Sequence, residues 1–221
     1  MAYQLCDQVS FCLPGGRSVF LDARRDRYFC LSGAAELAFR ALLNGEPATS
    51  SGLGLLIQSQ LVEEGEGGEP PMAAPSPSRP VRSLLEEPPA TVSSRARVVV
   101  EVAWTVAKAR LRMKRQAFAM IMDRLRARKR SAEAVEHGGA DTSLQWASVF
   151  NTARRTAPIK PVCLPDSLAL LDFLARRGVF ADLVLGVKLN PFGAHSWVQT
   201  DQVILNDTVD HVNAHTPILV V

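Results

Sequence analysis

The stretch that decides the fold of the second half of the chain is PVCLPDSLALLDFLARRG, residues 161–178. Its apolar residues recur at helical spacing and share one face: Leu164, Leu168, Leu171 and Leu174 or Ala175. Pro165 is tolerated only in the first turn of a helix, and Gly178 suits the C-terminal end. Together these constraints predict a helix that begins at Cys163.

A cysteine at the start of a helix has a defined chemistry. The positive end of the helix favours thiolate over thiol, and the thiolate is the nucleophile of papain-like cysteine proteases. The sequence therefore suggests Cys163 as a nucleophile. The alternative stays open at this point, because most cysteines in such a position are small buried hydrophobic residues.

A base for Cys163 has to come from four histidines: His137, His195, His211 and His215. His195 lies in residues 193–198, which alternate like a strand after the Pro191-Phe192 turn. Residues 181–189 and 203–205 are predicted as further strands, and Asp207 follows the second of them. A sheet packed on the Cys163 helix would bring His195 to the helix tip, where Asp207 could fix its tautomer.

The order Cys-His-Asp is by itself a weak signal. A strand histidine is usually a half-buried residue with satisfied hydrogen bonds, and an aspartate after Asn206 usually forms a turn. Metal binding by His211 and His215 is disfavoured, because Asn213, Thr216 and Pro217 argue against a helix there. His137 lies beside two glycines in an expected loop, and no metal site is predicted.

The N-terminal part of the sequence predicts a compact α+β unit. Strands are expected at residues 9–13, 18–22 and 27–31. Ser32 can cap a helix that ends near Asn44 and Gly45, and a second helix carries one apolar stripe, made of Leu53, Leu56, Ile57 and Leu61. This order indicates a small winged-helix-like module.

Such modules often bind DNA, but the second helix has no Lys or Arg between Ser51 and Pro70. Without cations to meet phosphates, DNA binding is not expected. An exposed strand edge that pairs with an extended peptide fits better. A purely structural module remains the alternative.

The domain organisation follows from composition. A recognition domain is expected at residues 1–66, a linker rich in Pro and Gly at 67–92, and a second domain at 93–221. Helices are predicted from Arg95 to about Glu136. Residues 95–130 hold twelve Lys and Arg against two acids, although the whole chain carries only +3. That stretch is either the solvated side of a packed helix pair or a surface for an acidic partner, a nucleotide or a membrane.

Other features bear on the compartment. The N-terminus has no basic region followed by an apolar run, so no secretory signal is expected. No stretch of eighteen apolar residues predicts a membrane span. Cys6, Cys12, Cys30 and Cys163 show no metal-binding spacing. A cytoplasmic protein with reduced thiols is the simplest expectation.

Five short motifs follow one another between residues 163 and 207: Cys163-Leu164-Pro165-x-Ser167-Leu168-Ala169-Leu170, Leu174-x-Arg176-Arg177-Gly178, Leu185-Gly186-Val187, Pro191-Phe192-x-Ala194-His195-x-Trp197-Val198 and Leu205-Asn206-Asp207. Their combined pattern resembles the lasso-peptide biosynthesis B proteins. These are transglutaminase-like cysteine proteases that remove the leader from a ribosomally made precursor. The catalytic Cys, His and Asp of that family fall on Cys163, His195 and Asp207.

The N-terminal module is similar to the leader-recognition element of fused B proteins, which holds the leader as an added strand. The resemblance implies a small winged-helix-like leader-binding domain joined to a papain/transglutaminase-like protease domain. Leader-contacting residues would then lie on the edge strand and the second helix: Arg27, Tyr28, Phe29, Cys30, Leu31, Leu56 and Gln60.

The resemblance also implies partners. These are a precursor peptide and an ATP-consuming lasso macrocyclase, with cleavage that depends on ATP. The sequence contains no Gly-rich Lys-Ser/Thr phosphate loop, so no ATP site can be placed. Two alternatives to the peptidase are a transglutaminase-like acyl transferase and a non-catalytic adaptor that binds peptide or nucleic acid.

Overall fold

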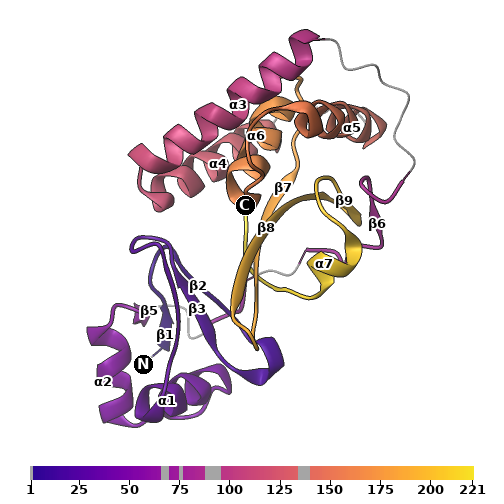
Figure 1. Cartoon of the computed structure of the whole chain (residues 1–221). Coiled ribbons are helices and arrows are strands. Elements are labelled where there is room, and N and C mark those ends of the chain that lie inside the picture. Colours follow the sequence, from indigo (N-terminus) through magenta and orange to yellow (C-terminus); the bar gives the residue numbers. More distant parts are fainter. Residues whose placement is uncertain (1, 66–69, 75–76, 88–95, 134–139) are drawn as a thin grey trace. The chain divides into compact units, whose positions relative to one another are not determined.

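The computed structural model describes residues 2–65, 70–74, 77–87, 96–133 and 140–221. The chain divides into two compact units, Met1–Pro75 and Ser76–Val221 (Figure 1). The predicted mixture of helices and sheets is confirmed. His137 and parts of the expected linker lie outside the described residues.

The first unit contains two small antiparallel sheets. One has the order β2 (Val9–Cys12), β3 (Val19–Asp22) and β4 (Arg27–Cys30), and the predicted strands in these three places are confirmed. The other pairs β1 (Ala2–Leu5) with β5 (Val62–Gly65). This second pair has no counterpart among the predicted strands, because AYQL and VEEG lack an apolar alternation that would mark them.

Two helices complete the first unit, α1 (Gly33–Leu43) and α2 (Ser50–Gln58), after a short 3-10 turn at Pro14–Gly16. The core is aromatic. The ring of Phe39 meets the rings of Phe11 and Phe20 edge-on, at centroid distances of 4.9 and 4.8 Å. Leu61 is buried beside them although α2 ends before it. The winged-helix-like interpretation of this unit remains a prediction.

The second unit is built on a five-stranded sheet with the order β10-β7-β8-β9-β6. The strands β7 (Asp182–Lys188), β8 (Gly193–Thr200) and β9 (Val203–Ile204) are antiparallel neighbours and match the predicted strands. β10 (Thr216–Val220) pairs with β7 on the other side. The strand β10 has no counterpart among the predicted strands.

Part of the segment predicted as a linker contributes to this sheet. Arg82–Ser83 form β6, which runs parallel to β9. The Val81 backbone N–H donates to the carbonyl of Gln202, the residue before β9, at 2.9 Å. The Leu84 backbone N–H donates to the carbonyl of Ile204 in β9 at 3.0 Å. A strand of two residues among prolines has no periodicity to read, so only its tertiary pairing reveals it.

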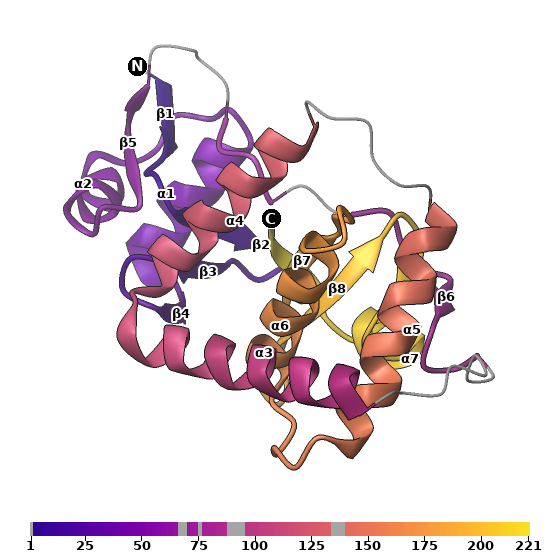
Figure 2. The same cartoon turned by 90° about the horizontal axis from the view of Figure 1, so that it is seen from above.

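Four longer helices complete this unit: α3 (Ala96–Arg115), α4 (Phe118–Glu133), α5 (Ala140–Thr156) and α6 (Cys163–Ala175). α6 contacts α3 and α5 as well as β7 and β8 (Figure 2). It is consequently buried from Ser167 to Leu174 around its whole circumference, rather than on the single face that its leucine spacing predicts. Gly178 ends the helix with φ +70°, as expected of a C-terminal glycine.

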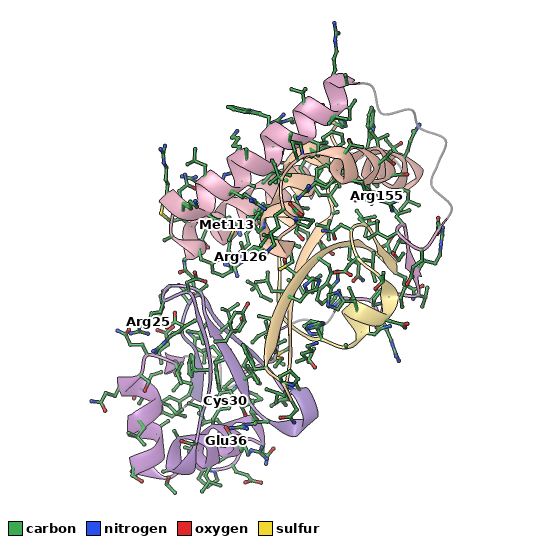
Figure 3. The ribbon with its side chains drawn as sticks, in the orientation of Figure 1. Arg25, Cys30, Glu36, Met113, Arg126 and Arg155 are labelled. Atoms are coloured by element: carbon green, nitrogen blue, oxygen red, sulfur yellow. The ribbon has the colours of Figure 1, made fainter. Side chains whose placement is uncertain are left out.

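The basic helices α3 and α4 use part of their charge inside the unit. Arg112 and Arg128 each lie 2.9 Å from a carboxylate oxygen of the buried Asp172 of α6. Lys129 pairs with Asp182 of β7, and Arg126, which Figure 3 labels on α4, pairs with Asp123 at 3.1 Å. The ion pairs of Arg112, Arg128 and Lys129 support the interpretation of a packed helix pair for that part of the basic stretch, whereas the Arg126–Asp123 pair lies within α4. No helix within the described ranges has the length and apolar character needed to cross a membrane.

Candidate active site

Cys163 is the first residue of α6, and Val162 before it is extended. The start of the helix is fixed by Asp166 in its first turn. Asp166 accepts from the Val162 backbone N–H at 3.3 Å and pairs with Arg154 of α5 at 3.1 Å. Both side chains of that ion pair are largely buried. Cys163 therefore sits at the positive end of a firmly held helix, where a thiolate is favoured.

His195 lies on β8, and Asp207 follows β9, the strand next to it. The structure brings them together: His195 Nε2 and Asp207 Oδ2 form a hydrogen bond. This leaves Nδ1 of the imidazole for the hydrogen bond with Cys163. The three residues predicted from the sequence thus form one connected set.

The helix tip is held against β8 by side chains one turn into α6. The Ser167 hydroxyl donates to the Ser196 carbonyl at 3.3 Å and accepts from Asn206 Nδ2 at 3.0 Å. Asn206 Oδ1 in turn accepts from the Val198 backbone N–H at 2.7 Å. Asn206 therefore ties α6 and β8 together beside Asp207. This role was not predicted, although Ser167 and Asn206 both occur in the motifs quoted above.

Asp207 is positioned by three further donors. Its Oδ1 accepts from the Thr208 backbone N–H at 2.7 Å and from His211 Nδ1 at 3.0 Å. Its carbonyl accepts from the hydroxyl of Ser83 on β6. No sequence signal could have linked Ser83 to the site, whereas the i,i+4 spacing of Asp207 and His211 is a signal that could have been read.

The expectation that no helix forms near His211 is wrong. Val209–Asn213 form the short helix α7, because the Thr208 hydroxyl caps it by accepting from the His211 backbone N–H at 3.4 Å. Thr216 and Pro217 lie beyond its end, in β10. His215 is buried and its Nδ1 donates to the His211 carbonyl at 2.8 Å, so it supports His211 from behind.

The electrostatics of the set favour a thiolate–imidazolium pair. The hydrogen bond with His195 is the main cause that lowers the pKa of Cys163, against the effect of burial. Burial alone would lower the pKa of His195, but the hydrogen bonds to Asp207 and Cys163 raise it to about 9. Burial would raise the pKa of Asp207, because it disfavours the charged carboxylate, but hydrogen bonds from His195, Thr208 and His211 lower this pKa instead. All three pKa shifts thus favour the charged forms of these groups.

Ser196 is a further polar group at the sulfur that was not predicted. Its hydroxyl is buried and has no hydrogen bond to an oxygen or nitrogen within the described part of the chain. Interactions of this hydroxyl and of the Ser196 backbone N–H with Cys163 both lower the pKa of the thiol. A buried hydroxyl is costly to leave unpaired, which makes the thiolate its natural acceptor.

Comparison with known proteins identifies a family for most of the second unit. A family described as the transglutaminase-like superfamily matches residues 103–220, which contain α4 to β10 and all but the start of α3. The chain belongs to the transglutaminase-like superfamily. The match covers the candidate site and leaves the first unit outside it. No solved structure matches the chain.

This transglutaminase-like chain is also similar to the microcin J25-processing protein McjB of Escherichia coli. The two are 44% identical over 48 residues. That segment is 22% of this chain and covers 23% of the length of McjB. The similarity is therefore local and concerns less than a quarter of either protein.

The residues predicted to contact a leader lie in the first unit. Arg27 to Cys30 form β4, which has a paired neighbour, β3, on one side only among the described strands. Leu56 is fully buried, so it can support a binding surface from beneath but cannot form it. The Gln60 side chain accepts from Arg25 at 2.9 Å. Cys30 and Arg25 are labelled in Figure 3.

Proposed function

We propose that this chain is a cysteine peptidase that removes the leader from a ribosomally synthesised lasso-peptide precursor before macrocyclisation. The observation that carries the proposal is the connected set of Cys163 at a helix start, His195 and Asp207. Membership in the transglutaminase-like superfamily and the local similarity to McjB support it.

The chemistry follows from the residues in the set. The Cys163 thiolate attacks the carbonyl carbon of the scissile bond, and the His195 imidazolium gives its proton to the leaving amine. The resulting thioester is hydrolysed by a water that His195, now neutral, deprotonates. Asp207 holds the imidazole in orientation and stabilises its charge. The Cys163 backbone N–H, in the first turn of α6, is the proposed oxyanion donor.

Leader recognition is proposed for the first unit. An extended leader would add to the three-stranded sheet along β4, where its backbone could pair with that of residues 27–31. The guanidinium of Arg27 lies over the ring of Phe29 at 5.1 Å, and this pair would give the edge a charged and aromatic side. Binding there would raise the local concentration of the scissile bond at Cys163.

The function is tested with the precursor peptide encoded beside this chain. The full chain and Cys163→Ala are incubated with it, with and without ATP and the partner cyclase, and peptide masses are followed. If the precursor loses a leader-sized fragment with the unaltered chain but not with Cys163→Ala, the result supports both the peptidase activity and Cys163 as its nucleophile. Equal cleavage by Cys163→Ala would contradict the assignment.

An added primary amine separates hydrolysis from acyl transfer in the same assay. A peptide that gains the mass of the amine would show the transferase that the superfamily also allows. A chain that binds the leader but never shortens the precursor, under any of these conditions, would be an adaptor. Comparing the reactions with and without ATP tests the ATP dependence that the resemblance implies.

A further inference from the structure

The Asp207 carboxylate serves two imidazoles instead of one. Oδ2 meets His195 Nε2 and Oδ1 meets His211 Nδ1 at 3.0 Å. A Cys-His-Asp set needs only the first of these contacts. The His211 side chain is 48% exposed, whereas that of His195 is 13% exposed, so His211 is the member of the group that reaches solvent.

These residues also bring metal-binding atoms together. One ring nitrogen from each histidine and one oxygen of Asp207 all lie within 4.8 Å of one another. The rings of His195 and His211 have centroids 4.3 Å apart. Two imidazoles, one carboxylate and an open fourth position are a donor set that suits Zn²⁺. The ligand atoms need to close by at most about 1.5 Å to reach the spacing of a tetrahedral zinc site.

We propose that His195, Asp207 and His211 form a zinc-binding site, and that Zn²⁺ bound there inhibits the enzyme reversibly. The inhibition rests on the proposed peptidase function, but the binding does not. Without His211, His195 Nε2 and an Asp207 oxygen would be only two ligands. His211 supplies the third ligand and the solvent-facing entry.

The inhibition follows from proton positions. Zn²⁺ would take the place of the proton between His195 Nε2 and Asp207, and that proton leaves to solvent. A metal-bound imidazole keeps its other proton on Nδ1 and has no lone pair left to accept one. His195 could then neither protonate the leaving amine in its imidazolium form nor activate water. The triad would be intact but unable to turn over.

The groups around the site are compatible with a divalent cation. The His211 backbone is held by the Thr208 cap and by the His215 ring, whose Nδ1 donates to the His211 carbonyl. A competing ligand is Cys163, which hydrogen-bonds His195 and could bind zinc through its thiolate. The experiment must therefore separate a His-Asp-His site from a thiolate site.

Binding is measured first in the full-length Cys163→Ala chain, by competition with a chromophoric zinc chelator and by the absorption of Co²⁺. The expected result is one strong site whose Co²⁺ spectrum has d–d bands without a thiolate-to-metal charge-transfer band. A thiolate band would overturn the proposal, since it would place the metal on Cys6, Cys12 or Cys30.

His211→Asn is the matched variant. An asparagine amide can still donate to Asp207 Oδ1, but it offers no imidazole nitrogen to the metal. We expect its zinc affinity to fall at least about tenfold, with far-ultraviolet circular dichroism unchanged. Equal affinity in the two chains would overturn the site.

The inhibition is measured by precursor cleavage in the unaltered chain and in His211→Asn, each with and without Zn²⁺. Zn²⁺ should slow cleavage by the unaltered chain and much less by His211→Asn, with recovery on adding a chelator, and equal inhibition of both would overturn the inhibitory mechanism. Alkylation of Cys163 with iodoacetamide should persist when Zn²⁺ is bound, because His195 keeps its Nδ1 proton beside the thiolate; protection of Cys163 in both chains would mean that zinc binds the thiolate directly. Should the precursor remain uncut in metal-free buffer while the site binds zinc, the peptidase proposal fails and the site stands.

Discussion

At the scale of single residues, the site is defined by opposite pKa shifts on two neighbouring side chains, those of Cys163 and His195. The hydrogen bond with His195 lowers the pKa of Cys163, and the bonds to Cys163 and Asp207 bring the pKa of His195 to about 9. Each member of the pair stabilises the charged form of the other. The reactive state is therefore the thiolate–imidazolium pair, which exists only between the two titrations.

This predicts a bell-shaped dependence of kcat/KM on pH. Activity rises as the Cys163 thiolate forms and falls as the pH rises through about 9, where the His195 imidazolium loses its proton. Asp207→Asn should move the alkaline limb to lower pH, because a neutral amide does not stabilise the imidazolium. Initial rates of precursor cleavage across the pH range provide the measurement. A profile that still rises above about pH 10 would contradict the ion-pair assignment.

Ser196→Ala tests the buried hydroxyl beside the sulfur. Removing a hydrogen bond to a charged group costs about 1.5–3 kcal/mol, so the thiolate should be less populated. We expect the rate of Cys163 alkylation at a pH below the thiol titration to fall about tenfold. Ser131→Ala is the control, because that hydroxyl donates within α4, to the Ala127 carbonyl. An unchanged rate in Ser196→Ala would show that the hydroxyl does not hold the thiolate.

At the scale of elements, the pairing of β7 and β8 depends on one close approach. Gly186 of β7 lies opposite His195 of β8. A Cβ on Gly186 would be 2.8 Å from the Trp197 ring and 3.0 Å from Cβ of His215. Trp197 is buried and its ring stacks on His195 at a centroid distance of 6.2 Å. The glycine thus lets the tryptophan lie where it supports the imidazole.

Gly186→Ala should therefore disturb the site from behind. We expect a loss of about 1–3 kcal/mol in the free energy of unfolding, typical of overpacking, together with slower Cys163 alkylation. Chemical denaturation and the alkylation assay measure the two effects. Gly193→Ala, on β8, is the matched control, since its Cβ would meet only the flexible Lys188 side chain, at 3.2 Å. Equal stability of the two variants would refute the role given to Gly186.

At the scale of the whole molecule, the proposed tasks fall in different units. The set of Cys163, His195 and Asp207 lies entirely in Ser76–Val221, and the predicted leader-binding strand lies in Met1–Pro75. A change in one task should then leave the chemistry of the other intact. This separation of tasks can be tested in the full-length chain, without expressing the two units as separate proteins.

Arg27→Pro should weaken leader binding while sparing Cys163. Proline removes a backbone donor from β4, and each lost strand hydrogen bond costs about 1 kcal/mol. Affinity for a labelled leader is measured by fluorescence anisotropy, with Cys163→Ala as the reference chain. A leader N-methylated at alternate residues should bind several-fold more weakly, on the same reasoning. Unchanged affinity for both would remove β4 as the binding edge, whereas slower Cys163 alkylation in Arg27→Pro would contradict the separation of tasks.

The sequence alone was sufficient for the elements that carry strong local signals. Pro165 and Gly178 bracket α6, and the structure begins that helix at Cys163. The alternation of apolar residues predicted β7 and β8. In the first unit, short apolar runs separated by turn residues predicted the three strands between residues 9 and 31. These patterns depend on neighbours within one turn or one strand, so they can be read without a fold.

Only the tertiary structure showed which residues surround the candidate site. Ser83 donates to the Asp207 carbonyl across 124 residues, from a strand of two residues inside a proline-rich segment. His211 reaches Asp207 because Thr208 caps a short helix that three nearby residues argued against. α6 is buried from Ser167 to Leu174 because α3, α5 and the strands β7 and β8 all pack against it. The spacing of apolar residues depends on neighbours within one helix or strand, so it can be read from the sequence. Contacts between residues far apart in the chain leave no such local pattern. For this reason the helix and strands could be predicted, whereas the residues that contact Asp207 could only be found in the structure.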